Sequence, residues 1–254
     1  MAVTGLKSFA DHFKGYEDCY TIIGGTACEI LMSEIPGMQF RATNDIDMII
    51  LFEDKFEAFA KLFWEYIKEG DYTCGWKNSA EPHFYRFTKP RVGYPVQIEL
   101  FSRKPDYHLK AEQIIVPIYV DDDTSSLSAI LLNDDFYNFM LGGRTTANGL
   151  SILRAEYLIP FKMYAWLNLL DEKRAQKHVN TKDLHKHKND VFLLLQIVPG
   201  DIKVSVSGAV AEAVNRFLDE ITNDNIVLKD LGINSTLEEE TAALREMYVE
   251  VSLA

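Results

Sequence analysis

The sequence predicts an α+β fold, with a sheet and flanking helices in the N-terminal half and mainly helices in the C-terminal half. Short apolar runs of strand-like composition alternate with helical patterns up to about residue 150. Beyond that point, apolar residues recur at helical spacing. No internal repeat or low-complexity linker separates the halves. We therefore expect an α/β domain over residues 1–150 and a helical domain over residues 151–254.

Helical and strand patterns alternate over the first part of the chain. The expected elements are a helix at 1–15, a strand at 19–23, a helix at 27–34, a strand at 45–52 and a helix at 56–67 that Gly70 ends. Thr26 is a suitable N-cap for the second helix because its side chain can accept a hydrogen bond from a backbone amide. The almost unbroken apolar stretch 48–52 is typical of a buried central strand.

Residues rich in β-branched and aromatic side chains mark further strands, with glycine, proline and charged turns between them. The expected strands are 72–76, 84–88, 96–101 and 114–120, and the expected helices are 155–171, 182–198, 206–221 and 237–251. A second Gly-Gly pair at 142–143 follows no strong strand pattern, so we expect a loop there. Arg86 belongs to a basic and aromatic run that is typical of a hairpin surface, with an acceptor groove as the alternative.

Composition narrows the classes of protein to consider. Hydrophobic residues make up 47% and charged residues 25% of the chain, as in ordinary soluble proteins. The net charge of −12 argues against a broad basic nucleic-acid surface. Cys19, Cys28 and Cys74 are odd in number and lack CxxC spacing, which indicates reduced, partly buried thiols. With no leader and no apolar run near the ~20 residues of a membrane span, we expect a cytoplasmic protein with no membrane contact.

Gly24 and Gly25 lie where a strand pattern gives way to a helical one. Glycine lets backbone N–H groups approach a phosphate without an intervening Cβ, and the helix N-terminus that follows adds partial positive charge. The alternative is a tight turn that needs a positive φ, which is the commoner use of Gly-Gly on its own. Together with Thr26, the pair is a candidate phosphate cradle.

Asp45 and Asp47 begin the predicted central strand. Residues i and i+2 of a strand project from one face about 7 Å apart. This separation suits carboxylates that hold one or two divalent cations, which in two-metal sites lie about 3.5–4 Å apart. Magnesium takes a few carboxylates and completes its shell with water and substrate phosphates. Two solvated acids at a strand end are the alternative, weakened by the deeply apolar run that follows, where carboxylates are costly without cations.

Glu99 lies in the apolar-flanked stretch 96–101, with Gln97 on the same face of the predicted strand. An inward-facing acid on a strand near the two aspartates would complete a cluster of three carboxylates. Such an acid can act as general base toward an attacking hydroxyl. A single acid on an edge strand is the plainer alternative. Taken with the glycine turn, the three acids favour a magnesium-nucleotide site.

Residues 24–27, 41–47 and 98–100 resemble the nucleotidyltransferase superfamily, which has a polymerase-beta-like fold. The superfamily pattern is a Gly-Gly or Gly-Ser turn, an Asp-x-Asp or Asp-x-Glu strand and a later acid. The resemblance is closest to the AbiEii/AbiGii-type toxin family, which places a basic and a small hydroxyl residue before Asp-x-Asp, as Arg41 and Thr43 do here. The gap between the glycines and the aspartates exceeds the usual superfamily spacing, but the toxin family tolerates it.

The resemblance reaches the helical half, where it implies that Lys162, Lys182 and Asp190 contact the nucleotide. From the residues alone, Lys162 is almost the only charge on an apolar helix, so its ammonium group needs a partner. A triphosphate and a neighbouring acid such as Glu156 are equally suitable. Asp190 is four residues from Lys186, a spacing that also makes an ordinary ion pair. Residues after about 200 match nothing.

The resemblance implies a mixed sheet flanked by helices and a Mg²⁺-dependent transfer of a nucleoside monophosphate from an NTP to an acceptor hydroxyl. Asp45, Asp47 and Glu99 would be the catalytic residues and the ligands of two Mg²⁺ ions. The expected nucleotide-binding residues are Gly24, Gly25, Thr26, Arg41, Thr43, Lys162, Lys182 and Asp190. The acceptor would be RNA, such as a tRNA end, or a small molecule, with an antitoxin protein as a possible partner.

Two other functions stay open at this point. One is a catalytically inactive module of the same fold that binds a nucleotide or a partner protein. The other is a small-molecule (antibiotic) nucleotidyltransferase, which has the same chemistry and a different acceptor. The presence of Glu99 favours an enzyme over the inactive module, because all three acids of a two-metal site are then available.

Overall fold

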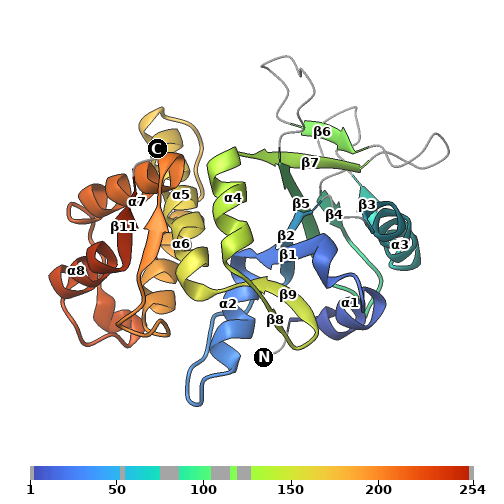
Figure 1. Cartoon of the computed structure of the whole chain (residues 1–254), viewed down its shortest axis with the longest axis horizontal. Coiled ribbons are helices and arrows are strands. Elements are labelled where there is room, and N and C mark those ends of the chain that lie inside the picture. Colours follow the sequence, from blue (N-terminus) through green and yellow to red (C-terminus); the bar gives the residue numbers. More distant parts are fainter. Residues whose placement is uncertain (1–2, 52–54, 75–85, 104–114, 119–126, 252–254) are drawn as a thin grey trace. The chain divides into compact units, whose positions relative to one another are not determined.

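A computed structural model of the chain describes residues 3–51, 55–74, 86–103, 115–118 and 127–251. The chain divides into two compact units. The first unit comprises Met1–Tyr137 and Arg144–Leu153, and the second comprises Asn138–Gly143 and Arg154–Ala254. Figure 1 labels their elements. The first unit holds a mixed sheet with helices and the second is mainly helical, so the predicted α+β class is confirmed.

The first unit contains most of the strands. Its described elements are α1 (Leu6–His12), a 3₁₀ helix (Glu17–Cys19), β1 (Tyr20–Ile23), α2 (Gly24–Ser33), β2 (Asp45–Ile50), α3 (Phe56–Glu69), β3 (Thr73–Cys74), β4 (Arg86–Thr88), β5 (Gln97–Arg103), β6 (Ile115–Ile118), β7 (Leu127–Leu132), β8 (Arg144–Ala147) and β9 (Leu150–Leu153). Helix α4 (Asp134–Gly142) runs from the first unit into the second. The predicted strands after residue 70 correspond to β3, β4, β5 and β6, and parts of their expected ranges lie outside the described residues.

The sheet of the first unit is mixed, and β2 occupies a central position. Within the described residues, the strand order is β3-β4-β5-β2-β1-β9-β8, with β7 paired to β5 and β6 paired to β7. Strand β2 runs antiparallel to β1 and parallel to β5. The long apolar run of β2 therefore has the internal place that the sequence predicts.

The core of the first unit is built from apolar strand residues and from aromatic rings. Ile46 and Met48 of β2 and Ile98 and Leu100 of β5 are fully buried. Rings from α1 and its C-cap residue Phe13, from β1 and from α3 form a second apolar group, in which the ring centroids of Phe13 and Phe59 are 5.5 Å apart. The members of this group are Phe9, Phe13, Tyr20, Phe59, Phe63 and Tyr66.

The second helix begins earlier than the sequence predicts, and the assignment of Thr26 as its N-cap is wrong. Helix α2 begins at Gly24, and its N-cap is Ile23, which makes no side-chain capping bond. Gly24 has a φ of 70°, a conformation that glycine adopts without a steric penalty. The helix therefore starts directly from the last residue of β1. Thr26 lies within its first turn and is fully buried.

The loop expected around residues 142–145 is also wrong. Gly142 ends α4, and Arg144 begins β8, which pairs with β9 in an antiparallel hairpin. Asn148 and Gly149 close this hairpin with φ values of 53° and 76°. A two-residue turn with positive φ at both positions favours Asn-Gly. This dipeptide is the sequence signal for the hairpin.

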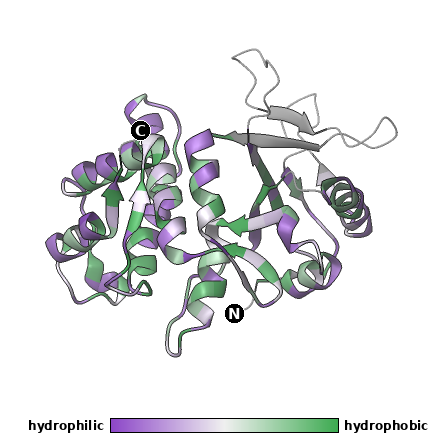
Figure 2. Ribbon diagram, in the orientation of Figure 1, coloured by the Kyte–Doolittle hydropathy of each residue, from purple (hydrophilic) through white to green (hydrophobic). Residues whose placement is uncertain are grey.

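The second unit consists of amphipathic helices and one small sheet. Its elements are α5 (Ala155–Arg174), α6 (Thr181–Leu195), β10 (Val204–Val206), α7 (Gly208–Ile221), a 3₁₀ helix (Leu228–Leu231), α8 (Leu237–Met247) and β11 (Tyr248–Glu250). The four predicted helices are confirmed, with boundary shifts at α7 and α8, where residues expected to be helical form the parallel pair β10–β11. Figure 2 shows hydrophobic and hydrophilic stretches on the helices of this unit.

The state of the cysteines and the hydrophobicity of the helices are also predicted from the sequence. Cys19 and Cys28 are buried thiols that form no disulfide there. None of the helices in the described ranges combines the length and hydrophobicity of a membrane span.

Replacing Phe13 with alanine should destabilise the first unit strongly. Phe13 is fully buried among other rings, so truncation removes its apolar contacts and leaves a cavity. We expect a loss of about 3–5 kcal/mol in the free energy of unfolding, measured by urea denaturation. Val92→Ala is the matched control, because Val92 is fully exposed and its truncation should change stability by less than about 0.5 kcal/mol. Equal effects of the two substitutions would contradict this account of the core.

Candidate functional site

The pairing of β2 with β5 places the three predicted acids on one face of the sheet. The two strands are parallel, with Asp45 opposite Gln97 and Asp47 opposite Glu99. Residues at the same register on neighbouring strands point to the same side. Between the two aspartates, Ile46 points to the other face and is fully buried. The structure therefore brings Asp45, Asp47 and Glu99 together.

Arg86 extends this row onto a third strand. It lies opposite Glu99 in the antiparallel pair β4–β5, and its guanidinium group forms an ion pair with the Glu99 carboxylate. The side-chain amide of Gln97 donates a hydrogen bond to Glu99 Oε1 at 2.8 Å. Glu99 is thus held between a cation on β4 and the carboxylate of Asp47 on β2.

The environment of Glu99 favours its protonated form. Its residue surface is only 8% exposed. Burial, followed by the charge of Asp47, raises the pKa of Glu99 to about 7, with Arg86 acting in the opposite direction and Asp45 adding a smaller increase. A cation bound among these acids would favour the ionised form, because opposite charge lowers a carboxyl pKa. The acids form a crowded negative site that binding of positive charge would relieve.

Gly24 is required by its contact with Asp47. A Cβ atom at position 24 would lie 2.0 Å from Asp47 Oδ2, and the φ of 70° disfavours other residues in any case. The aspartate therefore lies directly against the backbone turn that begins α2. This arrangement brings backbone N–H groups at a helix N-terminus close to the carboxylates, as a bound metal-phosphate group requires.

Arg41 and Thr43 return to the same turn from the segment before β2. A Cβ atom at Gly25 would lie 2.7 Å from Thr43 Oγ1 and 3.6 Å from Arg41 Nη2. Gly25 thus leaves room for a hydroxyl and a guanidinium group beside the first turn of α2. A guanidinium group and backbone amides are strong ligands for phosphate. Gly25, Arg41 and Thr43 therefore lie where they could bind one anion.

Thr26 has a structural contact in this site. Its hydroxyl donates a hydrogen bond to the backbone carbonyl of Asp45 at 2.6 Å. The bond joins the first turn of α2 to the first residue of β2. It therefore fixes the glycine turn relative to the aspartates. The predicted contact of Thr26 with phosphate stays a prediction.

The donor set fits magnesium in its chemistry. Carboxylates are the protein ligands that magnesium prefers, and water and phosphate complete its shell. Within the described ranges, no group of three His, Cys, Asp or Glu side chains is arranged to hold a metal ion. The ion pair with Arg86 is consistent with this absence, because the Glu99 carboxylate already has a cationic partner. Asp45 and Asp47 are the acids through which a metal-phosphate complex would bind.

The residues predicted in the helical half belong to the second unit. Lys162 Nζ donates to Asp190 Oδ2 at 2.9 Å, and the two side chains are 4% and 1% exposed. Glu156, the acid considered as a partner for Lys162, forms an ion pair with Arg154 instead. Lys182 is exposed in the first turn of α6. The nucleotide contacts predicted for Lys162, Lys182 and Asp190 stay predictions.

Sequence reasoning missed the role of Arg86 beside Glu99. Alternation along β4 places Arg86 and Thr88 on one face, but alternation alone does not say which residues lie opposite them. The ladder between β4 and β5 supplies that information. Which strands pair is decided by the tertiary fold. The sequence around β4 therefore does not show that Arg86 lies opposite Glu99.

Comparisons with known proteins add little to this geometry. No family model matches the sequence, and no curated protein matches it. A solved structure that does match is that of an antigenic nucleotidyltransferase-like protein from Paracoccidioides brasiliensis. It has 13% sequence identity and a TM-score of 0.48, covering 97% of this chain and 95% of that chain. At this identity and TM-score, the similarity assigns neither a family nor an activity.

Glu99 should titrate near neutral pH in the metal-depleted protein. The pKa of about 7 lies above the ordinary value of 4.5, so the folded state binds this proton more tightly than the unfolded chain does. Glu99 therefore favours folding below about pH 4.5, and this contribution is lost as the pH rises through about 7. NMR titration of the Glu99 carboxyl carbon, with a chelator present, should give a midpoint near 7.

Two variants test the causes of this shift. Asp47→Asn should lower the midpoint, because the charge of Asp47 raises the Glu99 pKa. Glu99→Gln should remove the corresponding pH dependence of the unfolding free energy. A midpoint near the ordinary glutamate value in the unmodified protein would contradict the burial and charge crowding described above.

Removing one member of the Lys162–Asp190 pair should destabilise the second unit. Lys162→Met or Asp190→Leu leaves the other charge of the pair buried without its partner. We expect the free energy of unfolding, measured by chemical denaturation, to fall by about 3–5 kcal/mol. The double variant should recover much of that loss, since both charges are gone. Lys182→Met is the exposed control and should change stability by less than about 0.5 kcal/mol. The nucleotide affinity of the stable double variant then tests whether this pair binds nucleotide. If the affinity equals that of the wild type, Lys162 and Asp190 have no binding role.

Proposed function

We propose that the chain is a metal-dependent nucleotidyltransferase, which moves a nucleoside monophosphate from an NTP to an acceptor hydroxyl and releases pyrophosphate. The observation that carries this proposal is the register that sets Asp47 beside Glu99 on parallel strands, with Gly24 directly against Asp47. Asp45 and Asp47 would hold Mg²⁺, with Glu99 beside them, and the ion would neutralise phosphate charge and favour departure of pyrophosphate.

The glycine turn and its neighbours would bind the triphosphate. Backbone N–H groups at the start of α2 have no intrahelical partners, and the helix dipole adds positive charge there. Thr43 and the Arg41 guanidinium lie beside Gly25, so they can donate to the same phosphate oxygens. The Thr26 bond to the Asp45 carbonyl holds this turn beside the aspartates. These residues would orient the NTP without taking part in bond making.

Glu99 would accept the proton of the acceptor hydroxyl. Without a bound cation its pKa is about 7, and a cation at Asp45 and Asp47 would lower that value, so Glu99 would be ionised and able to accept the proton near neutral pH. The acceptor oxygen then forms a bond to the α-phosphorus, and the bond from that phosphorus to the pyrophosphate oxygen breaks. Arg86 would stabilise the ionised Glu99 before the transfer. The charge of Asp47 opposes that ionisation and keeps Glu99 basic.

The acceptor and the biological setting are narrower parts of the proposal. The motif resemblance supports an AbiEii-type toxin acting on RNA, such as a tRNA end, under control of an antitoxin in the cytoplasm. A small-molecule acceptor fits the same chemistry. Lys162, Lys182 and Asp190 enter the proposal only through that resemblance, as residues that would balance phosphate charge.

A binding module without turnover is the second candidate, and one observation favours it. Arg86 and Gln97 both bind the carboxylate of Glu99, so the third acid is partly neutralised. A protein that retained nucleotide binding and lost transfer could keep this arrangement. In that case the nucleotide would bind at Asp45, Asp47 and the glycine turn without release of pyrophosphate.

Calorimetry and a pyrophosphate assay together separate the two candidates. Each of the four NTPs is titrated with and without Mg²⁺, and pyrophosphate is then measured with total tRNA, other RNA or a small-molecule panel as acceptor. Magnesium-dependent binding with pyrophosphate release supports the transferase. Magnesium-dependent binding with no release over any acceptor supports the module. Binding of no NTP under either condition rejects both.

Asp45→Asn and Asp47→Asn should each abolish transfer without loss of fold. Each substitution removes a metal-binding charge, and we expect at least a 100-fold loss of rate, on the order of that seen when one transition-state contact is removed. The melting temperature should stay near or above that of the unmodified protein, because repulsion among the acids is relieved. Asp11→Asn is the control, since Asp11 is an exposed acid of the same unit, with a side chain 66% exposed. An active Asp47→Asn enzyme would refute the metal assignment.

A further inference from the structure

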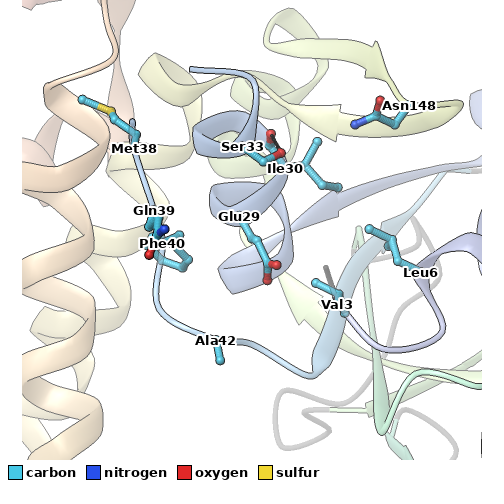
Figure 3. A pocket seen from close by; sticks show the side chains of 10 residues that line it. All are labelled: Val3, Leu6, Glu29, Ile30, Ser33, Met38, Gln39, Phe40, Ala42 and Asn148. Carbon is cyan, nitrogen blue, oxygen red and sulfur yellow. Dashed lines mark hydrogen bonds between the residues drawn. The ribbon is translucent and has the colours of Figure 1, made fainter. Parts of the chain in front are cut away.

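A pocket of the first unit lies next to the segment that carries Arg41 and Thr43. It has a volume of about 300 Å³, within the range of small-ligand sites. Its lining comes from α1 and the residue Val3 before it, from α2, from the segment before β2 and from the β8–β9 turn (Figure 3). The apolar lining residues are Val3, Leu6, Ile30, Met38, Phe40 and Ala42, and the polar ones are Glu29, Ser33, Gln39 and Asn148.

Glu29 is the charged group of this pocket. It is 8% exposed, and Figure 3 shows its side chain leaving α2 toward the space between Val3 and Ala42. The backbone N–H of Thr43 donates a hydrogen bond to the carboxylate. Its Oε2 atom has no hydrogen-bond partner among the residues that the structure describes. A buried carboxylate oxygen left in this state is costly. Burial raises the Glu29 pKa, and the positive charge of the N-terminal amino group acts in the opposite direction.

The lining and the carboxylate together define the chemistry of a fitting ligand. Apolar walls favour a hydrocarbon body, and an unpartnered carboxylate oxygen favours a positively charged N–H donor. We propose that this pocket binds a small organic cation, a primary amine on an apolar body, with its ammonium group donating to Glu29 Oε2. The ammonium group would neutralise the buried charge while the body covers the apolar side chains around it.

The pocket is connected to the candidate site through the extended segment before β2. Phe40 and Ala42 line the pocket, whereas Arg41 and Thr43 lie against Gly25. The two sides of one segment therefore face two sites, and Glu29 also binds the backbone of Thr43. A ligand in the pocket would fix this segment and so favour nucleotide binding. The effect on nucleotide binding rests on the proposed function, whereas binding of an amine in the pocket does not.

Direct binding of phenethylamine tests the pocket without any nucleotide. Its affinity for the whole protein is measured by NMR-detected titration at pH 7.5, with phenethyl alcohol as the uncharged probe of the same size. We expect the amine to bind at least about tenfold more tightly than the alcohol, because the hydroxyl can donate to the Glu29 carboxylate but carries no positive charge. Equal affinities, or shifts confined to residues away from the pocket, would overturn the proposal.

Three variants make this test specific. Glu29→Gln keeps the shape of the side chain and should weaken amine binding by about tenfold or more while leaving alcohol binding unchanged. Glu57→Gln, at an exposed position on α3, should change neither affinity. Ala42→Trp fills the pocket from an exposed position and should abolish binding of both probes. Unaltered amine binding in either pocket variant contradicts the assignment, and the second variant decides the matter if the first fails to fold.

The connection to the glycine turn is tested separately. NTP affinity is measured with and without saturating phenethylamine in the unmodified protein and in Ala42→Trp. If phenethylamine raises the NTP affinity of the unmodified protein but not that of Ala42→Trp, the connection is supported. If it leaves the NTP affinity of the unmodified protein unchanged, the connection is refuted. If no NTP binds at all, the proposed function fails while the amine titration still decides whether the pocket exists as a ligand site.

Discussion

The parallel pairing of β2 with β5 is the constraint on which the site depends. Ile46 and Met48 are buried opposite Ile98 and Leu100, so the apolar face fixes the register of the two strands. A slip of one residue would turn every side chain of one strand to the other face. Burial of hydrocarbon on one side thus decides which carboxylates meet on the other. The position of Asp47 beside Glu99 is therefore secured by buried apolar side chains on the opposite face.

The face that carries the acids holds charged groups together at a cost in stability. Like charges sit together at the ends of β2 and β5, and the Glu99 carboxyl is held largely out of water. Arg86 offsets only part of this cost. Structures tolerate such groups where a ligand supplies the missing charge, and strongly shifted pKa values gather at functional sites for that reason. The pocket around Glu29 repeats this pattern on the other side of the segment before β2.

Local patterns in the sequence predicted the parts of the fold that depend on near neighbours. The run after Asp45 indicated a central strand, and helical spacing located α3 and the four long helices of the second unit. Contacts between distant segments were beyond such patterns. The ion pair of Arg86 with Glu99 depends on strand order, and Lys162 finds Asp190 only when two helices are packed. Thr26 was misjudged because glycine let the helix start inside the turn.

The position of β9 in the sheet has a consequence for the order in which the polypeptide acquires its structure. Ile152 is the parallel neighbour of Ile22, and Ser151 meets Thr21 across 130 residues of chain. During synthesis, the edge of β1 that pairs with β9 therefore has no partner until 130 further residues have been added. An uncovered strand edge invites pairing with other chains, and closing so long a loop is slow. Chaperone demand during translation follows from this late closure.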